Sequence, residues 1–436
     1  MFLQALLPRW RYPKDMSRRS LRWARALRHR NYRLFIAGQG TSQIGTWLSK
    51  FATSWMAWVL TGSPFMVGLV TFFNNAPTPL IAPFAGVFVD RMNRHRVVIV
   101  TQICAALQSA ALAAFAFTGT MTVWHLILLG AAQGVINAFD MPARQSFLRQ
   151  MIDDPADLPN AIALNSSMVN AAKLTGPAVA AVLVGLVGEA WCFTIDAISY
   201  VAVIGSLLAM RITRLVPPAK NTRVFADMAD GFRYAMSVPL IRSVIGMLAV
   251  TSVLAGAYTS LLPVVAAKHL DGGPYTLGIL MSSAGLGALS GALYLASRTT
   301  VLGFGRMIGI VTMGCSIGMM ALELAGTTAI AAVLLFIIGM CLMIQMAATN
   351  TIVQTITPPD KLGRVMSLYL VAFTGGMPLG AAIEGSAAEH IGAVHTFALA
   401  GLVCFVAALW FQRSLPGLRA QTRPLYVQLG ILRDSA

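Results

Sequence analysis

One apolar segment near the start of the chain carries a line of polar side chains at helical spacing. The line occupies positions i, i+4, i+7, i+11 and i+14, which are Gln39, Gln43, Thr46, Lys50 and Thr53. At 100° per residue these positions form a stripe about 80° wide on one helix face. Such a stripe predicts a water-filled cavity beside the helix. Hydrogen bonding to a neighbouring helix in a dry bundle is the alternative.

A second polar line lies in the apolar segment 161–187. It comprises Ser166, Asn170, Lys173 and Pro177, at i, i+4, i+7 and i+11. Two lysines that face one cavity would attract an anionic or oxygen-rich solute. The alternative is that a structural carboxylate such as Asp196 neutralises each lysine. The candidate cavity therefore comprises Gln39, Gln43, Thr46, Lys50, Asn170 and Lys173.

Carboxylates inside apolar segments are the candidates for binding a proton. A charge in such a segment is costly and normally faces a cavity or a partner. Asp196 and Glu384 are the candidate proton sites, whereas Glu323 is expected to reach the aqueous interface. Asp140 precedes Met141-Pro142, an N-cap pattern. We expect a new surface helix to begin there, with Arg144 and Arg149 directed toward lipid or a neighbouring loop.

These residues belong to a very apolar chain. Of its 436 residues, 57% are hydrophobic and 11% are charged, whereas a soluble domain has about 25% charged residues. The fold class expected is therefore an all-α membrane protein. The five cysteines form no C-x-x-C pair and the six histidines form no intramembrane pair, so we expect no cofactor, no metal and no enzymatic activity.

Twelve segments are long enough to cross a hydrocarbon core of about 30 Å. They are 33–60, 66–89, 97–117, 122–139, 161–187, 191–210, 240–267, 275–297, 306–325, 329–350, 362–388 and 392–412. If the N-terminus is cytoplasmic, 28 of the 32 Lys and Arg residues lie on the cytoplasmic side. This asymmetry predicts that both termini are cytoplasmic. Anionic membrane lipid, not nucleic acid, then accounts for the net charge of +16.

The chain divides into two halves around its longest polar break. We expect a basic N-terminal segment 1–32, a bundle over 33–210, a linker over 211–239 with a short amphipathic helix, a bundle over 240–412 and a tail over 413–436. The basic stretch 18–30 is either an amphipathic helix on lipid or a disordered tail. The halves repeat, because Pro64 and Gly68 match Pro274 and Gly278 at an offset of 210 residues. Two six-helix halves related by a pseudo-twofold axis are thus predicted.

A charged turn between the second and third segments carries a known pattern. It contains Gly86, Asp90, Arg91, Arg94 and Arg96, and it resembles the G-x-x-x-D-R-x-x-R-R/K signature of the major facilitator superfamily. The stretches 140–147 and 157–166 resemble the secretion-effector branch of that superfamily, which includes siderophore exporters. The resemblance implies a gate in which Asp90 approaches the start of the eleventh span. The equivalent turn near Arg298 lacks the aspartate.

The residues and the resemblance together predict a twelve-helix exporter in a bacterial-type inner membrane. We expect a monomer that moves a siderophore, or another small hydrophilic or amphiphilic metabolite, by alternating access. Proton coupling is implied by the resemblance, although the first and fourth spans are expected to lack a deep acidic residue. A broad multidrug efflux pump is the alternative within transport. A membrane sensor or enzyme on the same fold is the alternative from another class.

Overall fold

The computed structural model describes residues 22–212, 224–298 and 300–428, and the elements of these ranges are all helices. The first bundle comprises α1 to α7 with three short 3-10 helices. Its elements are η1 (Arg22–Arg28), α1 (Arg30–Thr61), α2 (Pro64–Asn75), α3 (Pro77–Arg91), α4 (Arg94–Phe117), α5 (Val123–Leu148), η2 (Arg149–Met151), η3 (Pro155–Asp157), α6 (Leu158–Val187) and α7 (Glu189–Leu208).

The second bundle follows a linker helix. Its elements are the linker helix α8 (Val224–Ser237), then α9 (Pro239–Leu254), α10 (Tyr258–Val264), η4 (Val265–His269), α11 (Pro274–Ala296), α12 (Phe304–Ala321), η5 (Leu322–Leu324), α13 (Thr328–Ile356), α14 (Pro359–Ile391) and α15 (Ala393–Gln428). α8 confirms the helix expected in the linker. Residues 213–223 of that linker lie outside the described residues.

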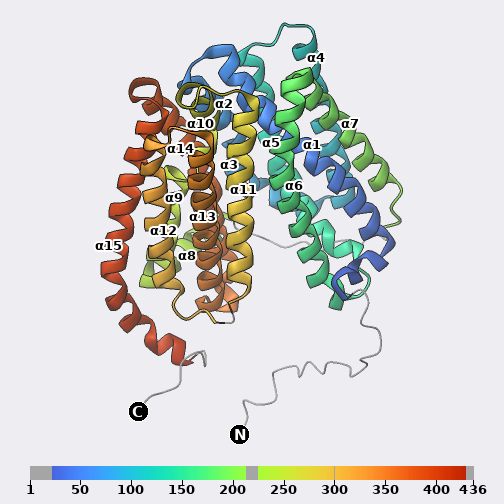
Figure 1. The fold of residues 1–436 in the computed structure, drawn as a ribbon. Coiled ribbons are helices and arrows are strands. Elements are labelled where there is room, and N and C mark those ends of the chain that lie inside the picture. Colours follow the sequence, from blue (N-terminus) through green and yellow to red (C-terminus); the bar gives the residue numbers. More distant parts are fainter. Residues whose placement is uncertain (1–21, 213–223, 299, 429–436) are drawn as a thin grey trace.

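The helices form twelve crossings. Eleven helical stretches of the described chain are long and apolar enough to cross a membrane. The remaining crossing is α1, whose 32 residues span about 48 Å and whose polar stripe lowers its hydropathy. Twelve crossings bring the start of α1 and the end of α15 to the same side, at the bottom of Figure 1. We call this the terminal side and the opposite one the distal side.

Two expected boundaries are wrong by nine residues or more. The fourth span was expected to end at residue 139, yet α5 continues without interruption to Leu148. Asp140 is therefore not an N-cap but an internal helix residue, and Pro142 lies within the helix. The last span was expected to end at 412, whereas α15 runs on to Gln428.

The internal repeat is visible in the helix starts. α2 begins at Pro64 and α11 begins at Pro274, and both prolines occupy the first turn, where a missing N–H costs nothing. Ser63 caps α2, since its Oγ accepts a hydrogen bond from the Met66 N–H at 3.2 Å. The repeated sequence pattern thus marks equivalent helices of two similar bundles.

Apolar packing joins the two bundles on one side of the molecule only. A single hydrophobic cluster crosses between them in the distal half, including Leu48 and Val70 from one bundle and Leu261 and Leu277 from the other. In the terminal half each bundle has a separate cluster. The described molecule is therefore closed by side-chain packing on the distal side, and its halves are packed independently on the terminal side.

Close backbone contact and a hydrogen-bonded carboxylate complete the distal closure. A Cβ added at Gly68 of α2 would overlap the Ala381 carbonyl oxygen of α14, and one added at Gly385 would lie 3.0 Å from the Gly68 Cα. Glu389 of α14 accepts two hydrogen bonds at Oε2, from the Ser63 Oγ at 2.7 Å and from the Phe65 N–H at 3.1 Å. Glycine at both positions lets α2 and α14 touch.

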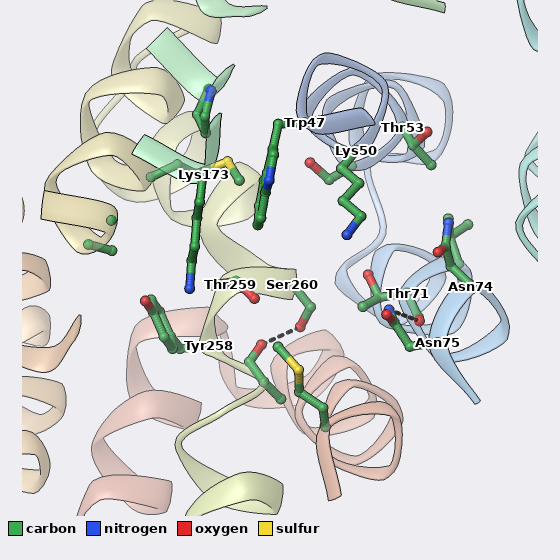
Figure 2. A pocket seen from close by; sticks show the side chains of 18 residues that line it. Trp47, Lys50, Thr53, Thr71, Asn74, Asn75, Lys173, Tyr258, Thr259 and Ser260 are labelled. Atoms are coloured by element: carbon green, nitrogen blue, oxygen red, sulfur yellow. Dashed lines mark hydrogen bonds between the residues drawn. The ribbon is translucent and has the colours of Figure 1, made fainter. Parts of the chain in front are cut away.

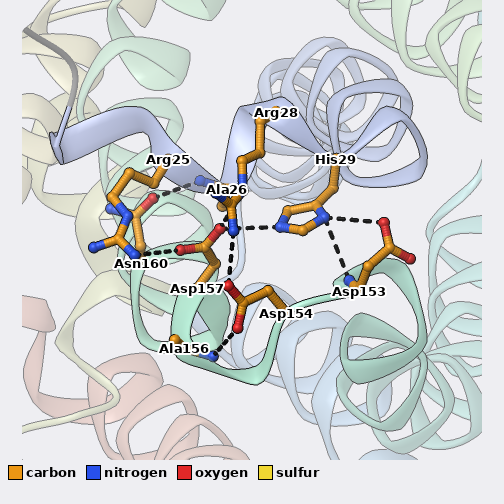
Figure 3. A network of polar contacts seen from close by, with 9 residues as sticks. All are labelled: Arg25, Ala26, Arg28, His29, Asp153, Asp154, Ala156, Asp157 and Asn160. Carbon is orange, nitrogen blue, oxygen red and sulfur yellow. Dashed lines mark hydrogen bonds and ion pairs between the residues drawn. The ribbon is translucent and has the colours of Figure 1, made fainter. Parts of the chain in front are cut away.

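The basic N-terminal stretch packs against the protein from Arg22 onward, and residues 18–21 lie outside the described part. His29 bridges two carboxylates of the α5–α6 connection, with Nδ1 3.1 Å from Asp153 Oδ2 and Nε2 3.1 Å from Asp157 Oδ2 (Figure 3). Arg28 contacts Asp157 at 2.7 Å and Asp154 at 2.8 Å. The contacts differ from both expectations for this stretch, because its charges pair with protein carboxylates.

Candidate functional site

A cavity of ≈ 190 Å³ lies between the bundles and contains both candidate lysines. Lys50 comes from α1 and Lys173 from α6, and Figure 2 shows both side chains directed into the cavity. The facing wall comes from the second bundle. Its lining residues include Ala257, Tyr258, Thr259, Ser260, Met281, Ala284 and Met377.

The polar stripe of α1 lines a second cavity, which lies within the first bundle. Gln39, Gln43, Thr46, Lys50 and Thr53 all line it, together with residues of α2, α4, α5 and α7. Lys50, Thr53 and Asn74 line both cavities. The structure thus places the stripe on the wall of a polar cavity, with Lys50 at the junction between the two.

One residue of the candidate set lies elsewhere. Asn170 is not among the residues that line these two cavities, and its side-chain amide donates to the Ser166 carbonyl at 2.9 Å. It is one turn nearer the terminal side than Lys173. Their spacing of three residues places Asn170 and Lys173 on a similar face, but the cavity does not extend along α6 to Asn170.

The two lysines are not neutralised by a salt bridge. Among the ion pairs of the described residues, none includes Lys50 or Lys173. The Lys50 Nζ lies 4.8 Å from the centroid of the Trp47 ring, a cation–π contact that leaves the ammonium free to bind an anion. Asp196 does not form a salt bridge with Lys173, as the alternative interpretation would require.

Asp196 is buried against the second cavity. It is 3% exposed, and its Oδ2 accepts a hydrogen bond from the Ser109 Oγ at 2.7 Å. Its Oδ1 has no hydrogen-bond partner among the described residues. α1 approaches this carboxylate closely because residue 45 is glycine, and a Cβ there would lie 2.9 Å from the Asp196 Cα. The carboxylate is thus held by hydroxyl groups beside a cavity that also contains Lys50.

Glu384 differs from Asp196. It is 2% exposed, and neither of its carboxyl oxygens has a hydrogen-bond partner in the described chain. It lines neither of the two cavities. Of the two candidate proton sites, Asp196 lines a cavity that contains Lys50, and Glu384 lines neither of these cavities.

The second cavity contains an ion pair that was not predicted from the sequence. Asp140 and Arg144, one turn apart on α5, form a salt bridge of 2.9 Å, and Arg144 Nη1 donates to Gln39 Oε1 at 2.8 Å. Arg144 was expected to face lipid or a neighbouring loop, and Asp140 was expected to begin a new surface helix. Both expectations are wrong because α5 passes through Pro142. The i, i+4 spacing of the two charges was the signal that could have revealed them.

A third cavity adjoins the first on the side of the second bundle. It is lined by Thr251, Gln345 and several methionines, and it shares Lys173, Tyr258, Thr259 and Met377 with the first cavity. Thr251 and Gln345 hydrogen bond to each other at 2.8–3.0 Å. Their polar groups satisfy each other, so this wall presents mainly apolar surface.

The gating motif lies at the α3–α4 turn on the terminal side. Gly86 and Asp90 fall in α3, Arg91 ends it, and Arg94 begins α4 with Arg96 close behind. The side chain of Asp90 lies outside what the structure describes. A Cβ added at Gly86 would meet no atom within 4 Å. α3 approaches α14 nearer the distal side than Asp90, where a Cβ on Gly375 would lie 3.9 Å from the Pro79 Cβ.

Two bundles of six crossings around a central cavity define a membrane transporter of the major facilitator fold. Residues 22–425 match the family described as transmembrane secretion effectors. The chain belongs to this family.

Several characterised proteins are similar over most of their length. The staphyloferrin A transporter of Staphylococcus aureus is 24% identical over 84% of this chain and 92% of its own. The enterobactin exporter EntS of Citrobacter koseri is 23% identical over 84% and 87%. Macrolide efflux protein A of Streptococcus pyogenes is 22% identical over 86% and 93%.

Solved structures share the fold at lower identity. The peptide transporter POT superposes with a TM-score of 0.68 at 14% identity, covering 90% of this chain and 95% of its own. An inward-facing bacterial homologue of the lysosomal transporter Spinster gives 0.65 at 15% identity, covering 92% and 97%. These matches support the fold alone.

Proposed function

We propose that the protein exports a small anionic, amphiphilic metabolite of the siderophore type by alternating access. One observation carries this proposal: Lys50 and Lys173 project into one cavity between the bundles, and neither forms a salt bridge with a carboxylate of the described residues. A buried cation without a counterion is costly, and an anionic solute would supply that counterion. The similarity to transporters of staphyloferrin A and enterobactin favours a siderophore.

The packing asymmetry supports alternating access. With both termini cytoplasmic, as the distribution of basic residues favours, the distal closure faces outward and the cavity can load from the cytoplasm. Reorientation then requires separation of α2 from α14 on the distal side. We place the protein in a bacterial inner membrane, as a monomer, because one chain forms every wall of the cavity.

Labelling can test this orientation. Single cysteines at Thr120 and Asp271, both on distal loops, should react in whole cells with a membrane-impermeant thiol reagent, in a background without native cysteines. A cysteine at Ser297, at the terminal end of α11, should react only after the cells are opened. Labelling of the Ser297 position in intact cells would show that the terminal side faces outward, which is opposite to the proposed orientation.

Proton coupling through Asp196 belongs to the same proposal. Its carboxylate is buried, accepts a hydrogen bond from the Ser109 hydroxyl, and shares a cavity with Lys50. A proton that binds this carboxylate removes a negative charge beside Lys50. Binding of an anion to Lys50 would weaken the attraction between Lys50 and Asp196, and would so link the solute to the proton.

A broad efflux pump is the second candidate, and one feature favours it. The second bundle presents Met281, Met377 and Tyr258 to the cavity, and methionine adapts to varied apolar shapes. Macrolide efflux protein A and the multidrug efflux pump Tap of Mycolicibacterium fortuitum are among the similar proteins.

Transport by purified protein separates the two candidates. Liposomes containing the protein should accumulate labelled anionic siderophores by counterflow, and an uncharged macrolide should compete weakly. Liposomes with the Lys50→Gln variant provide the matched control, because a pump for neutral drugs would keep its rate in that variant. Macrolide transport without siderophore transport would favour the broad efflux pump.

A further inference from the structure

The cavity inside the first bundle has a cation at its terminal end that the proposed lysine site does not use. Arg144 lies one turn before the end of α5 and lines this cavity with Gln39. Its side chain is 26% exposed, and two contacts fix its position: Asp140 Oδ2 at 2.9 Å and Gln39 Oε1 at 2.8 Å.

These contacts leave hydrogen-bond donors without acceptors. A guanidinium has five N–H groups, and the two contacts use one at Nη1 and one at Nη2. Gln39 is 2% exposed, and its Nε2 has no hydrogen-bond partner in the described chain. Because Gln39 Oε1 is held by Arg144, its amide N–H groups and the guanidinium lie close together. An acceptor with two oxygens would satisfy both.

Asp140 is largely engaged as an acceptor, because three contacts already use its two oxygens. Oδ1 accepts from the Thr101 Oγ1 and the Gln102 Nε2, both at 3.0 Å, and Oδ2 accepts from Arg144. Asp140 is 3% exposed. It is a positioning residue, which orients the guanidinium and balances its charge while the cavity holds no solute.

We propose that Arg144 and Gln39 form a second anion-binding position, so that the transported solute is a dianion. The inference rests on the proposed function, in which Lys50 and Lys173 hold the other anionic group. Gln39 and Lys50 are eleven residues apart on α1, which is roughly 16 Å of helix. The two groups of the solute are therefore separated by roughly that distance.

The wall between the two positions identifies the spacer that joins them. It is lined by side-chain amides and hydroxyls, namely Gln43, Thr46, Gln102, Gln108, Gln133 and Asn137. The Gln133 Oε1 also has no partner in the described chain. Such a wall pairs with amide or hydroxyl groups and not with a hydrocarbon chain. The ligand class is a dicarboxylate whose ends are joined by an amide- or hydroxyl-bearing spacer.

Two matched series of probes test this inference. Succinyl-oligoglycines carry a carboxylate at each end, whereas acetyl-oligoglycines of equal glycine number carry one. An extended residue spans about 3.5 Å, so a spacer of about three glycines fits. Calorimetric titration of the full-length protein should show that the best succinyl probe binds about 10-fold more tightly than its acetyl counterpart. The preference should fall for shorter and longer spacers.

Variants then assign the preference to this position. Arg144→Gln should abolish the preference for the succinyl probe and leave acetyl-probe affinity unchanged. Arg144→Lys should retain part of this preference. Gln39→Ala, which keeps the Asp140–Arg144 pair, should reduce it. Asp140→Asn should increase it, because a competing carboxylate is removed. Arg149→Gln, the loss of an exposed arginine outside these cavities, is the matched control and should leave it unchanged.

The outcomes separate this inference from the proposed function. Equal affinity of the two series in the wild type would overturn the inference and leave the lysine site standing. Failure of both series to bind would overturn both. Loss of affinity for both probes in Gln39→Ala, with Asp140→Asn also weakened, would show that Arg144 has only a structural role.

Discussion

The two bundles repeat each other in sequence and topology, yet they form unlike walls of one site. The first bundle contributes Lys50, Lys173, Arg144 and a row of amides to the cavities. The second contributes methionines, alanines, a tyrosine and the uncharged hydroxyl groups of Thr259 and Ser260. Among its described residues, Glu384 is the one buried charged side chain, and it lines neither of the two lysine cavities. The pseudosymmetric halves have therefore diverged in chemistry.

This difference separates two tasks. Charged and amide groups have defined partners and directions, so the first bundle can select the anionic part of a solute. Methionine side chains are flexible and apolar, so the second bundle can accommodate solutes of varied shape. Between the two, the distal contact of α2 with α14 must open for release.

The largest effect we expect distinguishes the two buried carboxylates. Asp196→Asn should abolish solute movement driven by a pH gradient, because Asp196 adjoins the cavity of Lys50. Exchange of solute for solute should continue, since it needs no proton. Glu384→Gln should leave both activities intact and should not lower the melting temperature, because it removes an unpartnered buried acid. The measurement is solute transport into liposomes with and without a pH gradient. The opposite pattern for the two variants would move the proton site to the second bundle.

A smaller effect should follow from disturbing the distal seam between the bundles. In Gly68→Val the side chain would overlap α14, and overpacking costs about 1–3 kcal/mol. The distal-closed population should fall by roughly 5- to 150-fold relative to open states. Cysteine reactivity inside the cavity from the distal side should rise accordingly. Gly246→Val is the control, because a Cβ at Gly246 meets open space. Equal reactivity in the two variants would show that this contact does not close the molecule.

The sequence predicts the fold and one wall of the site because those features are periodic. The stripe from Gln39 to Thr53 follows helical geometry, and the structure places all five residues along one cavity. Arg144 was missed because Pro142 resembled a helix start, whereas buried partners of Asp140 stabilise a continuous α5. Burial and partners decide such cases, and neither is visible in local sequence. The depth to which a cavity extends along a helix also depends on tertiary packing, and this is why Asn170 lies outside the cavity.

The apolar wall should affect affinity moderately. Met377 lines both the central cavity and the cavity beside it. Met377→Ala should weaken binding of an amphiphilic anion by about 1 kcal/mol, or roughly fivefold. It should not affect binding of a hydrophilic anion of equal charge. Leu302→Ala, an exposed position on a terminal-side loop, is the control in the same titration. Equal weakening of both anions by Met377→Ala would contradict the division between the bundles.

The smallest effect concerns the network that ties η1 to the α5–α6 connection. The backbone N–H of Ala156, followed by Arg28, holds the pKa of Asp154 below its usual value. A depressed pKa stabilises the folded state above the unfolded pKa of about 3.9, and this contribution is lost as the pH falls through the folded value. Asp154→Asn should therefore narrow the difference in melting temperature between pH 6 and pH 3 slightly, with unchanged transport. A wider difference in melting temperature in Asp154→Asn would contradict a depressed pKa of Asp154.

The central claim is that two unpaired lysines in one cavity bind an anion. Its most direct test is titration of an anionic siderophore into Lys50→Gln and Lys173→Gln, with a melting curve for each and Arg298→Gln as an exposed control. Loss of one charge-assisted contact should weaken binding by about 10- to 150-fold in each lysine variant, with the fold intact and the control unchanged. Wild-type affinity in both well-folded lysine variants would contradict the account.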